Sequence, residues 1–195
     1  RASAVTSELE RRALTPQQLK QASQKLILRI KTSHLLLRHQ HIALYLGNDG
    51  EICPQQLISL LRKYGKQAYL PVIHPLKKQQ LIFCRITPKT QFRANRFGIS
   101  EPVFESSRRL AAKHLSLVLM PLVAFDEQGN RMGMGGGFYD RIFAYKLKQK
   151  NSRPKLIGLA HDFQKQITLP LATWDVPLEG VMTEKAFYQN QAKTD

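Results

Sequence analysis

The chain has 195 residues, of which 43% are hydrophobic and 23% charged, so it is long and apolar enough to bury a core and is not disordered over most of its length. Its longest nearly apolar run, 115–125, is shorter than the ~20 residues that cross a bilayer, and residues 1–12 lack the apolar stretch of a secretory signal. Two cysteines, Cys53 and Cys84, lack the spacing of a disulfide framework or a zinc site, so we expect a reducing, cytoplasmic setting.

A strong positive charge is the first unusual feature of the chain. Thirty Lys and Arg stand against 14 Asp and Glu, a formal net charge of +16, and most of the excess lies in residues 1–97. The partner is therefore expected to be an anion. The basic residues come singly or in pairs, such as Arg11-Arg12 and Lys77-Lys78, which is typical of solvated positions on a folded domain. A groove for a small polyanion fits this pattern as well as RNA does.

The first half of the chain predicts two helices and two strands in alternation. Thr15-Pro16 starts a helix, because the hydroxyl can cap and proline is tolerated in the first turn, and the apolar spacing continues to about His34. Turn signals then delimit three elements, namely a strand over 42–46, a helix over 55–64 and a strand over 68–73. The order βαβ implies a parallel pair with a right-handed crossover.

The second half predicts further strands around one glycine-rich loop. The elements are a strand at the sheet's edge or on a hairpin over 81–86, a strand buried on both faces over 115–120, a helix over 139–150, and strands over 156–160 and 180–183. No internal repeat and no long linker divides the chain. We therefore expect one α/β domain, residues 1–195, with helices on both faces of a mostly parallel open sheet.

The loop between the buried strand and the next helix is the most informative segment. Four glycines fall within five positions, namely Gly133, Gly135, Gly136 and Gly137. Such a backbone can approach an anion closely and direct N–H groups at it, so the loop predicts a phosphate cradle. Arg131 and Arg141 flank it as cations, and Asp140 supplies a carboxylate suited to Mg²⁺.

The loop matches neither of two common nucleotide motifs. A P-loop needs a lysine and a hydroxyl that are missing here, and a dinucleotide fingerprint needs a third glycine where Phe138 stands. A glycine-rich turn that only packs a helix against a sheet is the structural alternative.

The run from Pro121 to Arg141 resembles the signature of the 5-formyltetrahydrofolate cyclo-ligase family, also called 5,10-methenyltetrahydrofolate synthetases. It reads P-L-V-A-F-D-x-x-G-x-R-x-G-x-G-G-G-F-Y-D-R. Other segments agree in order and spacing and extend the resemblance over about residues 8–187; they are 11–15, 49–52, 69–72, 98–102, 158–160 and 174–178.

The resemblance implies a ligase that closes 5-formyltetrahydrofolate to 5,10-methenyltetrahydrofolate with release of ADP and phosphate. ATP would phosphorylate the formyl oxygen, and the folate N10 would then displace phosphate from the activated carbon. Such phosphoryl transfer needs positioning and charge neutralisation rather than a protein nucleophile. The lack of GxSxG and HExxH motifs agrees with this chemistry.

Carried over residue by residue, the resemblance implies three sets of contacts. ATP would be bound by Arg131, Gly133, Met134, Gly135, Gly136, Gly137, Phe138 and Tyr139, of which Arg131 and Tyr139 would act in catalysis. The folate would be bound by Leu46, Glu51, Met134, Gly135, Gly136, Gly137 and Phe138, with Glu51 accepting hydrogen bonds from the pterin. Asp140 and Asp175 would hold Mg²⁺. The N-terminal Lys and Arg that reach ATP in many members have no match in residues 4–10, and this contact is not assigned to Arg1.

Local sequence alone favours plainer roles for several of these residues. Glu51 would be a solvated loop carboxylate, Asp175 a cap or turn residue and Trp174 a core residue, while His39 and His41 lack a third metal ligand nearby. Two other functions stay open, namely a basic protein that binds nucleotides or nucleic acid without turnover, and a small-molecule kinase or phosphosugar-binding regulator. We expect a monomer whose partners are ATP and a reduced folate, including polyglutamylated forms, rather than a membrane or nucleic acid.

Overall fold

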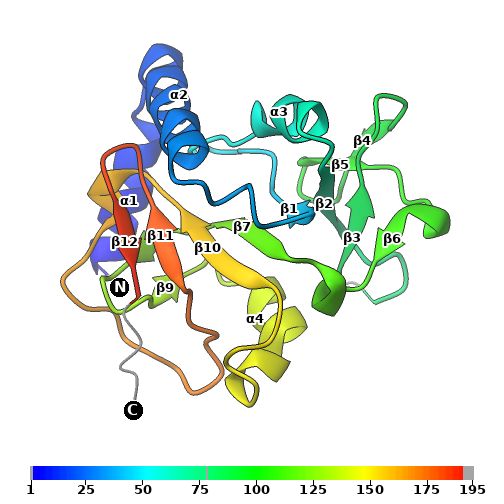
Figure 1. The fold of residues 1–195 in the computed structure, drawn as a ribbon. Coiled ribbons are helices and arrows are strands. Elements are labelled where there is room, and N and C mark those ends of the chain that lie inside the picture. Colours follow the sequence, from blue (N-terminus) through cyan, green and yellow to red (C-terminus); the bar gives the residue numbers. More distant parts are fainter. Residues whose placement is uncertain (1, 78, 191–195) are drawn as a thin grey trace.

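A computed structural model describes residues 2–77 and 79–190; Arg1, Lys78 and 191–195, which include both ends of the expected domain, lie outside the described residues. A sheet of eight strands forms the centre of the described chain (Figure 1). Its strands, in spatial order, are β12 (Phe187–Gln189), β11 (Gly180–Met182), β10 (Lys155–Leu159), β7 (Leu117–Pro121), β1 (His41–Ala43), β2 (Gln67–Ile73), β3 (Leu81–Arg85) and β6 (Arg109–Leu110).

The central strands β11, β10, β7, β1 and β2 run parallel, and β12, β3 and β6 add antiparallel pairs at the two sides. From β1 the chain crosses to β2 on one side, whereas from β7 it crosses to β10 on the other. The strand order therefore reverses between β1 and β7. Open α/β sheets bind ligands outside the carboxyl ends of the strands at such a switch point.

Helices cover both faces of the sheet, as expected. They are α1 (Ala2–Arg12), α2 (Pro16–Thr32), α3 (Leu57–Lys63) and α4 (Phe138–Phe143). Figure 1 shows α2 and α3 on one face and α4 on the other. The capping box at Thr15 starts α2 as the sequence predicts, because its hydroxyl accepts from the Gln18 N–H while the Gln18 side chain accepts from the Thr15 N–H.

Alternate side chains of the parallel strands feed two separate layers of core. Ile42 of β1 packs with Leu26 and Leu57 from the helices of one face, whereas Ala43 packs with Phe143 of α4 on the other. A strand that is buried on both faces has a continuous apolar sequence. Such strands are therefore easy to recognise in the sequence. The predicted mostly parallel α/β fold is confirmed.

Three sequence predictions are wrong in detail. The strand predicted over 42–46 ends at Ala43, and only Leu44 adds one more hydrogen bond, to the Tyr69 carbonyl, before the chain leaves the sheet. The helix predicted over 139–150 ends at Phe143 and continues as the 3-10 turn η3 (Ala144–Leu147), where buried Lys146 is tied to the Ser152 carbonyl. Trp174 is 69% exposed and is not a core residue.

Several short elements around the sheet were not predicted from the sequence. They are the hairpin β4 (Phe92–Ala94) and β5 (Ser100–Pro102), the hairpin β8 (Ala124–Phe125) and β9 (Arg131–Met132), and the 3-10 turns η1 (Ser106–Arg108), η2 (Ala112–His114) and η4 (Asp162–Gln164). The strand predicted over 81–86 does form a hairpin, with β2. Within residues 2–77 and 79–190, no helix combines the length and the apolar character needed to span a membrane.

Candidate active site

A cavity of about 530 Å³ opens at the carboxyl ends of β1 and β7, where the strand order reverses. We call it the carboxyl-edge cavity. Tyr45 and Leu46 line it just after β1, Pro121 and Leu122 line it at the end of β7 and just after it, and the glycine loop closes one side. Most of its lining is apolar with a few polar groups, which is the usual make-up of a small-molecule site.

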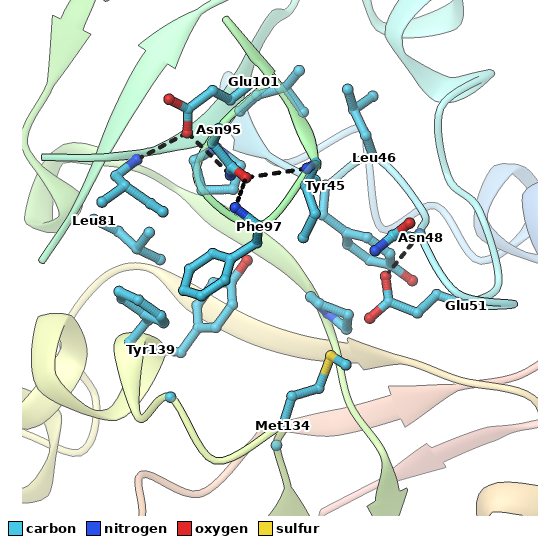
Figure 2. Close-up of a pocket in the computed structure, with 18 of the residues that line it drawn as sticks. Tyr45, Leu46, Asn48, Glu51, Leu81, Asn95, Phe97, Glu101, Met134 and Tyr139 are labelled. Atoms are coloured by element: carbon cyan, nitrogen blue, oxygen red, sulfur yellow. Dashed lines mark hydrogen bonds between the residues drawn. The ribbon is translucent and has the colours of Figure 1, made fainter. Parts of the chain in front are cut away.

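Ten of the residues predicted from the sequence line this cavity. They are Leu46, Glu51, Arg131, Gly133, Met134, Gly136, Gly137, Phe138, Tyr139 and Asp140. Figure 2 shows Glu51 and Tyr139 on opposite sides of the cavity, with Met134 between them at one margin. Gly135 and Asp175 are not among the lining residues of the described chain. The fold thus brings two distant stretches of sequence together in one space.

The glycine loop keeps an open space in front of its backbone. A Cβ built on Gly133 or Gly135 would meet nothing within 4 Å, and Gly135 has a φ of +83°, which side-chain-bearing residues rarely adopt. A Cβ on Gly136 would instead come within 2.7 Å of the Phe138 ring. The glycines therefore serve both a strained turn and a close approach, and the space is one that a phosphate chain can occupy.

A largely buried ion pair lies directly beside this loop. The Arg131 side chain is 5% exposed, and its Nη2 donates to Asp140 Oδ1 over 2.7 Å, while Nη1 donates to the Val176 carbonyl. Asp140 Oδ1 also accepts from the Val176 N–H at 3.1 Å. The β8–β9 hairpin, α4 and the segment at Val176 are thereby locked together. Such charge-assisted bonds are the stronger ones in proteins, so both side chains are held in place before any ligand binds.

Glu51 and Arg11 form a second buried charged group on the far side of the cavity. The Glu51 side chain is 9% exposed and its Oε2 accepts from the Asn48 N–H at 3.0 Å. The Arg11 side chain is fully buried, lies 4.0 Å from Glu51 Oε1 and donates to Asp49 over 3.1 Å. Burial raises the pKa of Glu51, and the nearby Arg11 charge opposes the rise.

Two of the plainer sequence interpretations are therefore wrong. Glu51 is not a solvated carboxylate, and Arg11 is not a solvated cation, although its neighbour Arg12 is half exposed and pairs with Asp49. Asp175 does take the turn role that its local sequence favours, since its Oδ2 accepts from the Ala172 N–H at 2.9 Å.

Comparison with known proteins places this arrangement in a family. The sequence profile of the 5-formyltetrahydrofolate cyclo-ligase family matches residues 7–184. The chain belongs to this family. A 5-formyltetrahydrofolate cyclo-ligase of Escherichia coli K12 is 38% identical over 179 residues, covering 92% of this chain and 97% of the relative. One from Haemophilus influenzae is 44% identical over 143 residues, covering 73% and 75%.

A solved structure supports the same placement. The 5,10-methenyltetrahydrofolate synthetase of Aquifex aeolicus superposes with a TM-score of 0.81 at 26% identity, over 100% of this chain and 94% of that one. The family resemblance predicted from the sequence is confirmed, with bounds close to the 8–187 expected.

Tyr139, which the family resemblance marks as catalytic, stays protonated at neutral pH. Burial raises its pKa well above the usual range, the Glu51 charge adds to the rise and Arg131 opposes it. Its hydroxyl therefore offers a hydrogen-bonding group rather than a base.

One wall of the cavity was missed from the sequence. The β4–β5 hairpin contributes Ile99. It also contributes Asn95, Phe97 and Glu101, which Figure 2 shows. Asn95 Oδ1 accepts from the N–H groups of Phe97 and Ile99 at 2.9 and 3.1 Å, and buried Glu101 accepts from the Ile73 N–H at 3.3 Å. The Asn-x-Phe-Gly stretch signals the turn, but no local pattern indicates that it faces the glycine loop.

The polar groups around the glycine loop suit Mg²⁺, which takes one or two carboxylates, several waters and the oxygens of phosphates. Both hydrogen bonds accepted by Asp140 use Oδ1, so Oδ2 is suited to a cation. Asp175 directly precedes Val176, the backbone partner of Asp140. The described residues hold no group of three or more His, Cys, Asp or Glu that could bind a metal unaided, so phosphate oxygens would have to complete the shell.

Proposed function

We propose that the protein is a 5-formyltetrahydrofolate cyclo-ligase that uses ATP to form 5,10-methenyltetrahydrofolate, ADP and phosphate. One observation carries this most strongly. A single cavity joins the glycine loop and the Arg131–Asp140 pair on one side to buried Glu51 on the other. Family membership supplies the reaction that such a two-substrate cavity would serve.

On the nucleotide side, we assign the phosphates of ATP to Gly133–Tyr139, where the backbone leaves space for them. Asp140, with Asp175 as second ligand, would hold Mg²⁺, whose charge when bound would offset that of the phosphates. Arg131 stabilises the charge that develops on the transferred phosphoryl group, and its bond to Asp140 orients it. Tyr139 donates a hydrogen bond within the same space, because its hydroxyl keeps its proton.

On the folate side, Glu51 accepts hydrogen bonds from the pterin N–H groups, and Leu46, Met134 and Phe138 supply apolar contacts. A carboxylate that is fixed by the Asn48 N–H and screened from water is well suited to recognise such donors. In this proposal the formyl group would lie between Glu51 and the glycine loop.

The reaction then needs only alignment. The formyl oxygen attacks the γ-phosphorus, an O–P bond forms and the bond to ADP breaks. N10 next attacks the formyl carbon, phosphate leaves with the electron pair of the C–O bond, and N10 gives up its proton. No protein nucleophile takes part, and the protein contributes position and charge neutralisation.

The test is to mix the protein with 5-formyltetrahydrofolate, ATP and Mg²⁺ and to follow methenyl product by its near-ultraviolet absorbance. We expect product only when all three are present. Binding of ATP without any product would instead favour a nucleotide-binding protein without turnover, and salt-sensitive binding of oligonucleotides without product would favour nucleic acid as the partner.

The proposal also includes a cytoplasmic location and a monomeric state. The location is supported by Cys53 and Cys84, which are free thiols in the structure, as expected in a reducing compartment. Gel filtration of the purified protein tests the monomer.

A further inference from the structure

A second hollow lies at the opposite edge of the sheet, and the proposed reaction makes no use of it. It has a volume of about 660 Å³ and lies at the amino ends of three parallel strands. His41 borders it at the start of β1, Ser116 just before β7 and Lys155 at the start of β10. We call it the amino-edge groove.

Cationic side chains that lack partners dominate this groove. Arg38, Lys150, Arg153 and Lys155 line it, and none of them forms an ion pair with another described residue. A fifth cation, Lys146, is buried beneath them. Its ammonium is already paired with the Glu179 carboxylate at 3.1 Å and donates to the Ser152 carbonyl at 2.6 Å. Glu179 is the one carboxylate in the described lining, and it is already paired with Lys146. No carboxylate of that lining is therefore left to neutralise the other four cations.

Two of these four charges, those of Lys155 and Arg153, act on one side chain of the groove. The ring of His39, which also lines the groove, has a lowered pKa, first because it is partly buried and then because of the positive charges of Lys155, Lys66 and Arg153. Positive charges gathered in a concave site attract a counter-ion more strongly than the same charges spread over a convex surface.

The lining favours a small phosphate compound over nucleic acid. Guanidinium groups such as those of Arg38 and Arg153 match phosphate oxygens in a two-pronged fashion. The volume falls within the range of small-ligand sites, roughly 300–1,000 Å³. Single-stranded nucleic acid is bound through aromatic stacking as well as charge, and the described lining includes no Phe, Tyr or Trp.

We propose that the amino-edge groove is a second ligand site, which binds a compound with two or three linked phosphate groups. The four unpaired cations match the charge of such a chain. The phosphate chain can be free or part of a nucleotide. The site is separate from the carboxyl-edge cavity, and the proposal does not depend on the reaction assigned there.

The experiment follows the ring signals of His39 by NMR while inorganic tripolyphosphate is added to the whole protein. The groove variant is Arg38→Gln/Arg153→Gln/Lys155→Gln. The matched control, Lys20→Gln/Lys25→Gln/Lys31→Gln, removes three exposed charges from α2. In the wild type and in the control, we expect tripolyphosphate to shift the His39 signals and to raise the pKa of His39. We expect the groove variant to bind tripolyphosphate at least about tenfold more weakly.

Further measurements identify the source of the phosphate chain and test the alternatives. Tighter binding of ADP than of tripolyphosphate assigns the phosphate chain to a nucleotide, and the reverse assigns it to a free chain. Unchanged His39 signals in the wild type, or equal losses in the groove and control variants, would overturn the proposal. It would also be overturned by a 12-nucleotide RNA that binds far more tightly than either phosphate compound and depends on the same three residues. The KM for ATP in methenyl formation should not change in the groove variant, which separates this site from the catalytic one.

Discussion

Replacement of Glu51 by glutamine tests the assignment of the two sides of the carboxyl-edge cavity. The substitution keeps the size of the side chain and an oxygen for the Asn48 N–H, so the loop keeps its hydrogen bond. It removes the negative charge of the carboxylate that, in the proposal, accepts hydrogen bonds from the pterin N–H groups. Because Glu51 is 9% exposed, water screens that charge little.

The expected loss follows from the strength of one buried, charge-assisted hydrogen bond. Such a bond contributes about 1.5–3 kcal/mol, which corresponds to a roughly 10- to 150-fold weaker affinity for 5-formyltetrahydrofolate. The affinity for ATP should stay nearly constant, since the glycine loop and the Arg131–Asp140 pair are untouched.

Stability provides an internal check on the Glu51→Gln variant. Burial raises the pKa of Glu51, so its contribution to stability is present below the ordinary pKa of 4.5 and is lost as pH rises through the raised value. At pH 7 the ionised side chain is therefore less favourable to folding than its protonated form, but its charge also lies 4.0 Å from buried Arg11, so the melting temperature of the glutamine variant reports which of these two effects is larger.

Calorimetric titrations with folate alone and with ATP alone, on the same preparation, measure the two affinities. Glu127→Gln serves as the matched control, because Glu127 is 60% exposed and pairs with Lys165 outside the cavity. Equal losses for both ligands would mean that the substitution disturbs the fold. Unchanged affinity for both ligands would refute the role of Glu51.

Three further predictions concern this cavity and the glycine loop beside it. Asp140→Asn should lower the rate of product formation by orders of magnitude in saturating Mg²⁺ while circular dichroism shows an intact fold, and full activity would remove Asp140 from the metal site. Gly135→Val places a branched side chain at a φ of +83° in the open space of the loop, so ATP affinity should fall strongly, and a stable variant with normal affinity would favour a purely structural turn. The KM for the folate should rise as pH falls through the raised pKa of Glu51, and the Glu51→Gln variant should lack this dependence.

The parts of the fold that the sequence predicts well are those with strong local signals. The capping residues at Thr15 fix the start of α2, and the apolar run at β7 is recognisable because both of its faces are buried. The glycine-rich stretch after it indicates one side of the carboxyl-edge cavity, because closely spaced glycines allow both a positive φ and a close approach.

The parts that escaped prediction depend on partners distant in the chain. The sequence indicates that Arg11 is a solvated residue at the end of a helix. In the fold it is buried, pairs with Asp49, 38 residues away, and lies 4.0 Å from Glu51. The β4–β5 hairpin has three-residue strands without an apolar alternation, so periodicity cannot reveal it. The reversal of strand order beside β1, which locates the cavity, is a property of topology rather than of any segment.

The fate of the formyl oxygen tests the central claim most directly. The enzyme would be given 5-formyltetrahydrofolate labelled with ¹⁸O in the formyl group, together with unlabelled ATP and Mg²⁺, and the inorganic phosphate released would be analysed by mass spectrometry. If ATP phosphorylates the formyl oxygen before N10 displaces it, each methenyl product formed is matched by one phosphate carrying ¹⁸O. Product accompanied by unlabelled phosphate, with the ¹⁸O in water, would contradict the mechanism.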